Sequence, residues 1–209
     1  MLFGITGGIG SGKSTIAQEL LKMGYPVFDT DKCAQQLMNN NPCIRSQIEL
    51  LFGSDIYQNE KLDRIQVAKQ VFNNSELLNQ LNQIVHPAVK FELSEWAKKK
   101  EVCFVESAIL FESGIDTMCN ATIAITAPEN LRIERACIRD GKSSTQIRQR
   151  MKNQMTEEER NNKADLVIYN DGTRQIPFLA EHIINFCKQF SGKDTSSAAA
   201  KPIPSKDKR

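Results

Sequence analysis

Short apolar runs alternate with longer stretches of amphipathic sequence along this chain. Five runs have the length and composition of buried β-strands: Leu2–Thr6, Pro26–Phe28, Val102–Glu106, Ala121–Thr126 and Leu166–Tyr169. Strands that alternate with helices are typical of a parallel sheet with right-handed crossovers. The pattern therefore predicts an α/β fold in which helices flank a parallel sheet.

Two helices are expected to pack on this sheet. The first follows the first strand directly and has apolar residues at positions 16, 17, 20 and 21. The second begins near Arg174 and carries one apolar stripe: Ile176, Leu179, Ile183, Phe186 and Phe190. Spacings of three and four residues place such side chains on one helix face, which is then able to cover the sheet.

The remaining segments predict further parts of the molecule. About seventy residues between the second and third strands lack a strand pattern but show helical patterns at roughly 62–73 and 76–100. A polar block at about 139–164 contains two capping boxes, Ser143-x-x-Gln146 and Thr156-x-x-Glu159, which predict two short helices. We expect a core of residues 1–31, 101–138 and 165–190, a helical subdomain of 32–100, a lid of 139–164 and a disordered tail of 191–209.

A glycine-rich loop separates the first strand from the first helix. Residues 7–14 match G-x-x-x-x-G-K-[ST], the pattern of a phosphate-binding loop, or P-loop. Glycines let the backbone turn its N–H groups toward an anion, Lys13 adds positive charge, and the Ser14 hydroxyl is a candidate Mg²⁺ ligand. The residues predicted to bind a nucleoside triphosphate are Gly7, Gly8, Gly10, Ser11, Gly12, Lys13, Ser14 and Thr15. The alternative is a flexible linker, which the flanking strand and helix disfavour.

Composition excludes several classes of protein. The 209 residues carry a net charge of +2, which is too small to indicate a nucleic-acid or membrane partner. The six cysteines (33, 43, 103, 119, 137 and 187) form no C-x-x-C pair, so zinc and a disulfide framework are disfavoured. No signal-peptide pattern and no apolar run of about 18 residues is present, so we expect a cytoplasmic protein. We expect a monomer or a weak homo-oligomer, although no feature of the sequence decides between them.

An acidic sequence, Asp29-Thr30-Asp31, ends the second strand. In open α/β sheets, ligands bind beyond the carboxyl ends of the strands, so these carboxylates should face the same crevice as the P-loop. Asp31 is the candidate to accept a proton from an acceptor hydroxyl or to orient that hydroxyl. Asp29 has two interpretations, because it could act there or cap the helix that begins near Lys32. A direct Mg²⁺ role for either aspartate stays open.

Basic residues gather between positions 132 and 152. They are Arg132, Arg135, Arg139, Lys142, Arg148, Arg150 and Lys152. The first three share one helical face, and a guanidinium group suits the charge of a transferring phosphoryl group. Arg139, at the start of the predicted lid, is the first candidate for a catalytic arginine and Arg135 the second. The alternative is a solvated basic face.

Two further residues, His86 and Glu106, have both a structural and a functional interpretation. Pro87 is expected to end or kink a helix, and His86 beside it is either structural or near a substrate. Glu106 ends the third strand, where an acid often reaches Mg²⁺ through water, but it is equally suited to a structural ion pair. Glu112 follows the apolar sequence 108–111 and has no assigned role.

Taken together, these motifs resemble the dephospho-CoA kinases, which complete coenzyme A by phosphorylating its precursor. The resemblance runs from Leu2 to about Phe190. Its motifs are I-T-G-G-I-G-S-G-K-S-T at the start, V-F-D-T-D-K at 27–32, I-V-H-P-A-V at 84–89, L-F-E at 110–112, R-x-x-x-R-D-G from 135, R-M-x-x-Q at 150–154 and A-D-L-V-I-Y-N-D-G at 164–172. The first motif is shared widely among kinases, whereas the ordered set is far more specific.

The resemblance implies a role for several residues. It implies ATP on the segment Gly10–Thr15, with Thr6, Asp31 and Arg139 around the transferred phosphoryl group. It further implies that the insertion with His86 and Pro87 forms the subdomain that binds dephospho-CoA, and that Asn170 lies near the adenine. The family usually has Pro-Leu-Leu before Phe-Glu, whereas this chain has Ala108-Ile109-Leu110, so its loop geometry before Glu112 is not implied.

Three other functions are compatible with a P-loop. A GTP-dependent switch is suggested by Asn162-Lys163-Ala164-Asp165, which fits the guanine-reading pattern N-K-x-D, but this motif precedes a strand and the chain has no D-x-x-G. A kinase for nucleosides, nucleotides or shikimate-like acceptors is the stronger alternative. A non-catalytic ATP-binding module would not need Asp31 and the arginines. We therefore expect direct in-line transfer to the ribose 3′-hydroxyl of dephospho-CoA.

Overall fold

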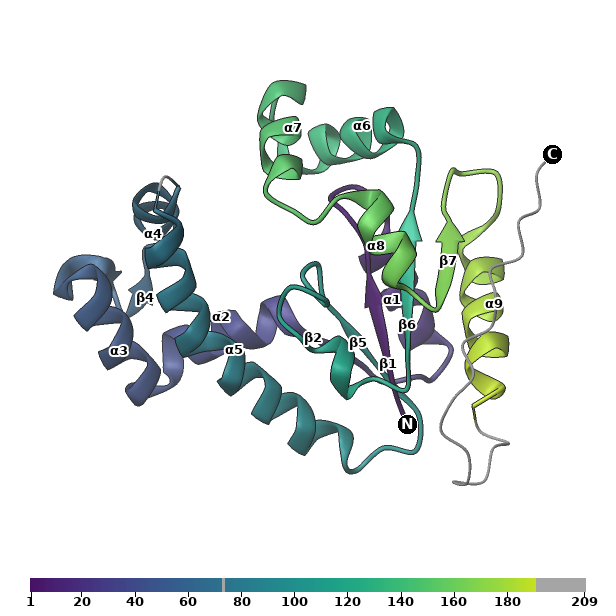
Figure 1. Cartoon of the computed structure of the whole chain (residues 1–209), viewed down its shortest axis with the longest axis horizontal. Coiled ribbons are helices and arrows are strands. Elements are labelled where there is room, and N and C mark those ends of the chain that lie inside the picture. The colour runs from purple at the N-terminus through teal and green to yellow at the C-terminus, as the bar shows by residue number, and fades with distance from the viewer. Residues whose placement is uncertain (73, 191–209) are drawn as a thin grey trace.

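Figure 1 shows the computed structural model, which describes residues 1–72 and 74–190. The disordered tail expected at 191–209 lies outside the described residues. A five-stranded sheet forms the centre, in the order β2-β5-β1-β6-β7, and every pair in it is parallel. Its strands are β1 Leu2–Thr6, β2 Val27–Asp29, β5 Cys103–Glu106, β6 Ala121–Thr126 and β7 Leu166–Tyr169. The α/β fold and all five strands are confirmed, with boundary shifts of one residue in β2 and β5.

The burial of each strand matches its position in the sheet. All residues of the central strand β1 and of its neighbour β6 are buried, and both strands read as continuous short apolar runs. Such strands need helices on both faces, because neither face tolerates water. β7 and β2 lie at the two edges of the sheet and are more accessible.

One face of the sheet is covered by the two helices that the sequence predicted. α1 (Lys13–Lys22) and α9 (Ile176–Lys188) contact each other and share a core cluster with the strands. Ile16 and Leu20 from α1 meet Ile183 from α9 there, and all three side chains are fully buried. The apolar stripe on the last helix is therefore its sheet-facing side.

The chain between β2 and β5 is largely helical and extends to the left of the sheet in Figure 1. It contains α2 (Thr30–Asn40), α3 (Pro42–Phe52), the 3₁₀ turn η1 (Ser54–Ile56), α4 (Arg64–Val71) and α5 (Ser75–Ala97). The two predicted helical patterns correspond to α4 and α5. α5 belongs to two cores: its first half packs against α3 and α4, and its second half packs on β5.

One expectation for this region is wrong, and one of the two alternatives for Pro87 is excluded. A small hairpin, β3 (Tyr57–Gln58) and β4 (Lys61–Leu62), lies where no strand was expected, because two-residue strands are too short to show alternation. Pro87 does not end a helix, since α5 continues through it for ten further residues to Ala97. Pro87 lacks the N–H that would bond one turn back, so tertiary packing on both sides of it must hold the helix together.

Three helices lie between β6 and β7 in the sequence: α6 (Glu129–Asp140), α7 (Ser144–Lys152) and α8 (Glu157–Lys163), while the turn η2 (Asp116–Met118) precedes β6. α6 and α7 lie above the carboxyl end of β6 in Figure 1, and α8 packs beside β6. The lid expected at 139–164 corresponds to α7 and α8. Both predicted capping boxes are present, at the starts of α7 and α8. Within the described part of the chain, no helix is both long and apolar enough to cross a membrane.

The second half of α5 should contribute strongly to stability. Leu93 is fully buried in the cluster between α5 and β5, so Leu93→Ala should lower the free energy of unfolding by about 2–5 kcal/mol. Leu50 of α3 is 88% exposed, and Leu50→Ala should change it by less than about 0.5 kcal/mol. Urea denaturation of both variants measures the difference. Equal effects would contradict this assignment of the core.

Candidate functional site

The P-loop joins β1 to α1 and has a conformation that depends on glycine. Gly10 and Gly12 have φ of 77° and 90°, in the left-handed region that favours glycine, and Gly12 is the N-cap residue that precedes α1. A methyl group built on Gly10 would lie 2.0 Å from the carbonyl oxygen of Arg132 in α6. The loop is therefore shaped by its own dihedral angles and by the helix packed against it, which leaves the first N–H groups of α1 available to an anion.

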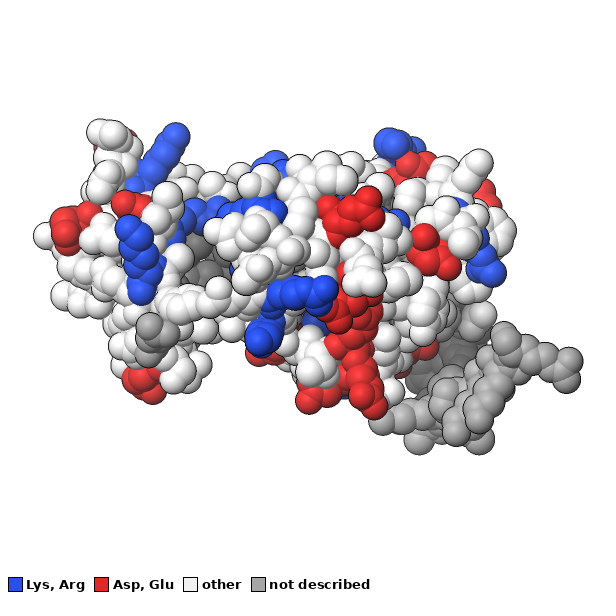
Figure 2. All heavy atoms as spheres, turned by 90° about the horizontal axis from the view of Figure 1, so that it is seen from above, with Lys and Arg blue, Asp and Glu red and all other residues white. Residues whose placement is uncertain are grey.

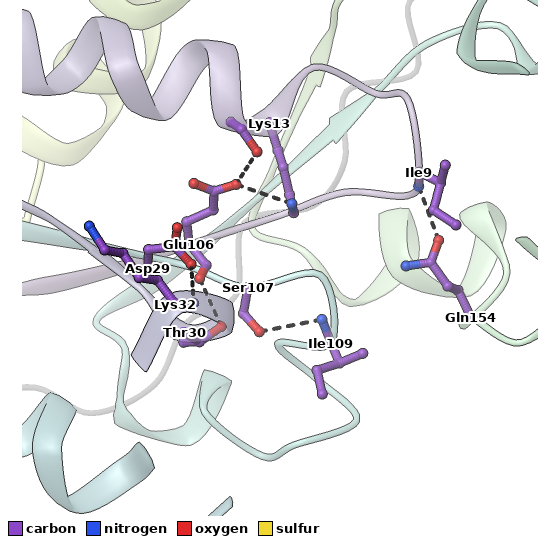
Figure 3. A network of polar contacts seen from close by, with 10 residues as sticks. Ile9, Lys13, Asp29, Thr30, Lys32, Glu106, Ser107, Ile109 and Gln154 are labelled. Atoms are coloured by element: carbon purple, nitrogen blue, oxygen red, sulfur yellow. Dashed lines mark hydrogen bonds and ion pairs between the residues drawn. The ribbon is translucent and has the colours of Figure 1, made fainter. Parts of the chain in front are cut away.

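A carboxylate on the neighbouring strand holds the two functional side chains of the loop. Glu106, at the end of β5, forms an ion pair with Lys13 at 3.1 Å and accepts a hydrogen bond from the Ser14 hydroxyl at 2.5 Å (Figure 3). The side chains of Lys13 and Glu106 are only 16% and 12% exposed. The carboxyl end of β5 therefore lies directly against the loop, as the position of Glu106 in the sequence suggested.

The two aspartates after β2 play different parts. Asp29 caps α2, because its carboxylate accepts a hydrogen bond from the backbone N–H of Lys32 at 2.9 Å (Figure 3). Between the aspartates, the buried Thr30 hydroxyl donates to the carbonyl of Glu106 at 3.0 Å and so joins α2 to β5. The capping interpretation of Asp29 describes what the structure shows.

Asp31 lies in the first turn of α2, near Lys13. Its carboxylate is accessible to solvent but surrounded by enough protein that burial raises its pKa, while the positive charge of Lys13 opposes this shift. The neighbouring carboxylates of Asp29 and Glu106 raise the pKa further. A carboxylate in such surroundings binds a proton more readily than a fully hydrated one, which suits a proton acceptor.

Two hydroxyl groups inside the site have no protein partner. Thr6 ends β1 and Ser11 lies within the loop, and both side chains are almost completely buried. Among the described residues, neither the Oγ1 of Thr6 nor the Oγ of Ser11 has a hydrogen-bond partner. Unsatisfied buried hydroxyls are uncommon and call for an explanation. Two of them beside a P-loop fit a site that completes its hydrogen bonds with phosphate oxygens or water.

Asn170 forms a hydrogen bond to the loop, and Arg135 forms one to Asn170. The Asn170 side chain, 4% exposed after β7, donates to the carbonyl of Ser11 at 2.9 Å. Arg135 donates from α6 to the carbonyl of Asn170 at 2.9 Å. The structure therefore brings both predicted residues to the loop, although they were predicted as nucleotide ligands and these bonds are to the protein.

Arg139 and His86 lie further from the loop's own contacts. The Arg139 side chain is 60% exposed and makes two hydrogen bonds to Asp140, at 2.7 and 3.1 Å, and Asp140 also binds Arg150 of α7 at 2.6 Å. His86 is half-buried on α5, where burial and the nearby Lys90 lower its pKa, and Pro87 beside it is exposed. Neither Arg139 nor His86 makes a polar contact with the P-loop among the described residues.

Several contacts around the loop were not expected from the sequence. Gln154 accepts a hydrogen bond from the backbone N–H of Ile9 in the loop at 3.0 Å (Figure 3). Glu112, after β5, accepts one from the N–H of Met155 at 3.2 Å. Arg132 and Arg160 are buried next to Gly8. Gln154 belongs to the motif R-M-x-x-Q, which was noted, but Arg160 had no signal because it reads as one charge in a polar helix.

Two oxygen donors of the site fit a magnesium ion. Ser14 and Glu106 lie together beside Lys13, and Mg²⁺ typically uses one or two protein oxygens together with substrate phosphates and water. Across residues 1–72 and 74–190 there is no group of three or more His, Cys, Asp or Glu side chains able to hold a metal by themselves. The donor set therefore suits an ion that arrives with a nucleotide rather than one held by the protein alone.

A P-loop that faces a carboxylate on the adjacent strand, under a helical lid that carries arginines, is the arrangement of the P-loop kinases. A solved structure of a Thermus thermophilus protein has the same fold: it superposes with a TM-score of 0.79 at 34% identity, covering 92% of this chain and 98% of that one. The sequence profile described as Dephospho-CoA kinase matches residues 1–175. The chain belongs to the dephospho-CoA kinase family.

Relatives that carry this name support the assignment. A curated protein named dephospho-CoA kinase from Porphyromonas gingivalis is 45% identical over 157 residues, which cover 74% of this chain and 78% of that protein. The solved dephospho-CoA kinase from Campylobacter jejuni has a TM-score of 0.66 at 26% identity, covering 91% of this chain and 98% of that one. The resemblance noted in the sequence is confirmed, and ATP is the phosphate donor of this family.

Gly10 should tolerate no side chain. Gly10→Ala places a methyl group against a backbone carbonyl at a positive φ, so we expect loss of measurable ATP binding in addition to lower stability. Gly24→Ala is the matched control: its φ is 90°, but no atom lies within 4 Å of the added methyl group. It should cost about 1–2 kcal/mol and leave ATP affinity unchanged. Thermal melting and ATP titration decide, and wild-type ATP affinity in Gly10→Ala would contradict the assignment.

Proposed function

We propose that this chain transfers the terminal phosphoryl group of ATP to the ribose 3′-hydroxyl of dephospho-CoA, giving coenzyme A and ADP. The observation that carries the proposal is the position of Asp31 at the start of α2, close enough to Lys13 and Glu106 that their charges affect its pKa, which burial raises. Family membership supports the identity of both substrates. The donor loop follows β1 and Asp31 follows β2, at the same edge of the sheet with β5 between them. A donor site and a proton acceptor held at one edge are what direct transfer between two bound substrates requires.

Transfer proceeds in one displacement. Asp31 orients the 3′-hydroxyl, whose oxygen bonds to the terminal phosphorus as the bond from phosphorus to the bridging oxygen of ADP breaks. The hydroxyl proton passes to the Asp31 carboxylate late in the step. Lys13 leaves Glu106 to neutralise charge on the phosphates, and the hydroxyls of Thr6 and Ser11 gain the partners that they lack. No covalent intermediate with the protein is needed.

Magnesium has a defined place in this proposal. Ser14 is the residue that would hold the ion directly, and Glu106 would reach it through water. When bound, Mg²⁺ supplies positive charge to the phosphate oxygens. Glu106 then serves two purposes, because in the present structure it holds the Ser14 hydroxyl and Lys13 together at the mouth of the loop.

The helical parts are assigned to the two substrates and to closure. We propose that residues 32–100 bind the acceptor, with His86 and Pro87 on its side of the site, and that residues 139–164 form the lid over ATP. A separate apolar core of α3, α4 and the hairpin supports an independent body for most of the first segment. We further propose that Asn170 and Arg135 lie beside the adenine.

The alternative functions have less support. Asp165, the acid of the N-K-x-D sequence, uses its carboxylate to accept hydrogen bonds from the N–H and hydroxyl of Thr122, at 2.8 and 2.9 Å. It therefore anchors β7 to β6 and is not available to a guanine base. Basic and acidic side chains are interspersed over the face in Figure 2, which supports small-molecule substrates rather than nucleic acid. The proposed location is the cytoplasm, in keeping with six free thiols within the described residues.

Replacement of Asp31 tests the proposed base. Asp31→Asn keeps the size and polarity of the side chain but removes its ability to accept the proton, so kcat should fall by about 10²-fold or more. ATP affinity should change little, because Lys13 and the loop amides remain. Steady-state kinetics and nucleotide titration measure the two effects. Near-wild-type turnover would refute the role of Asp31.

Arg139 should affect the rate more than binding if it meets the transferring phosphoryl group. We expect Arg139→Ala to lower kcat by about 10²-fold and to change either KM much less. Lys22→Ala, which removes an exposed charge of α1, is the control and should leave kcat and KM unchanged. A rise in KM without a fall in kcat would make Arg139 a binding residue instead.

A further inference from the structure

A pocket of about 370 Å³ lies between the P-loop and the lid. Gly8 forms its wall on the side of the loop, and α6, α7 and α8 form the others. The charged residues that line it are Glu129, Arg132, Arg148, Lys152, Glu157 and Arg160. Four of these six side chains are cationic and two are anionic, so the pocket has an excess of positive charge.

Arg132 and Arg160 converge on one point of the loop. A methyl group built on Gly8 would lie 2.4 Å from Nη1 of Arg132 and 3.3 Å from Nη1 of Arg160. The two arginines come from different helices, α6 and α8, so their convergence is a feature of the tertiary fold and not of one helix face. Gly8 is the second residue of the loop and follows β1 within two positions of Thr6.

Both arginines are buried and incompletely satisfied. Arg132 is 6% exposed and Arg160 is 2% exposed, and among the described residues the Nε of each has no hydrogen-bond partner. An unsatisfied polar group on a buried charge is destabilising, because its lost hydration is not replaced by a hydrogen bond. Natural structures rarely retain two such groups at one place unless a ligand or water completes them.

The protein compensates only part of this charge. Arg132 pairs with Glu157 at 2.7 Å, and Arg160 donates to the carbonyl of Met155 at 2.6 Å. The pKa of Arg160 is lower than that of a free guanidinium group, mainly because of burial. The acids Glu112 and Glu157 oppose this shift, and the like charge of Arg132 adds to it. Arg160 thus has a buried like-charged neighbour and, among the residues that the structure describes, no direct carboxylate partner. An anion in the pocket would stabilise this arrangement.

We propose that Arg132 and Arg160 bind oxygens of the terminal phosphate of ATP beside Gly8 of the loop. The bound chemistry is a phosphate oxyanion, for which paired guanidinium groups are well suited. The terminal phosphate is favoured over the diphosphate of the acceptor because Gly8 belongs to the loop itself and lies next to Thr6 at the end of β1. This inference rests on the proposed function for the identity of the donor, but not for that of the acceptor.

The two arginines then link nucleotide binding to lid position. Arg160 belongs to the lid, and its partner Met155 is also held by Glu112 from the segment after β5. A terminal phosphate on Arg132 and Arg160 would join α6 and α8 through one anion. ADP lacks that phosphate, so Arg132 and Arg160 should keep their present contacts when ADP is bound.

A comparison of ATP and ADP affinity tests the proposal without any acceptor. Titration of the full chain with each nucleotide should show that Arg160→Gln weakens ATP binding by about 10-fold or more while ADP binding changes less than about twofold. Arg160→Lys keeps the positive charge but loses the paired N–H donors of the guanidinium group. It should weaken ATP binding by a factor between those of the wild type and Arg160→Gln, and leave ADP binding unchanged. Lys98→Gln, which removes an exposed charge at the end of α5, is the control and should leave both affinities unchanged.

The outcomes separate this inference from its alternatives. If Arg160→Gln does not fold, as judged by circular dichroism, Arg160→Lys decides by the same ratio of affinities. If a folded variant has the same ratio of ATP affinity to ADP affinity as the wild type, Arg160 does not bind the terminal phosphate. The same conclusion follows from a variant whose ATP and ADP affinities are unchanged while KM for dephospho-CoA rises, because the site then belongs to the acceptor diphosphate. Failure to phosphorylate dephospho-CoA would refute the proposed function but leave the affinity ratio, and this inference, intact.

Discussion

Glu106 connects the three segments on which the site depends. Its carboxylate forms an ion pair with Lys13 and accepts a hydrogen bond from the Ser14 hydroxyl of the P-loop. Its backbone carbonyl accepts a hydrogen bond from the Thr30 hydroxyl. β5 lies between β1 and β2 in the sheet, so one residue at its end reaches both the donor loop and the start of α2. The separation between the donor loop and Asp31 therefore follows from the order of three parallel strands rather than from flexible loops.

The helices after β6 contribute a second set of contacts. Gln154 binds the N–H of Ile9, and the carbonyl of Arg132 in α6 packs against Gly10. Glu112, from the segment after β5, binds the N–H of Met155. In kinases, closure of a lid excludes water from the transferring phosphoryl group. In the proposed function, the closing segment carries Arg160, and Arg132 meets it from α6.

The sequence predicted the parts of this molecule whose signals are local. Five apolar runs gave the sheet, Ser143 and Thr156 marked the starts of α7 and α8, and the glycine pattern located the loop. It did not predict that Arg132 and Arg160 meet beside Gly8, because two helices must first be placed by tertiary packing. Helix propensity was likewise a poor guide at Pro87, where packing on both sides overrides the break.

The central claim is that Asp31 and the P-loop serve one acceptor, the 3′-hydroxyl of dephospho-CoA. The direct measurement is incubation of the protein with Mg-ATP and a panel of dephospho-CoA, nucleosides and shikimate, followed by mass analysis of every acceptor and location of the new phosphate by NMR. The account predicts that dephospho-CoA alone gains one phosphate, on its 3′-oxygen, with one ADP formed per product. ADP formation without a modified acceptor, or phosphate on a different acceptor, would contradict it.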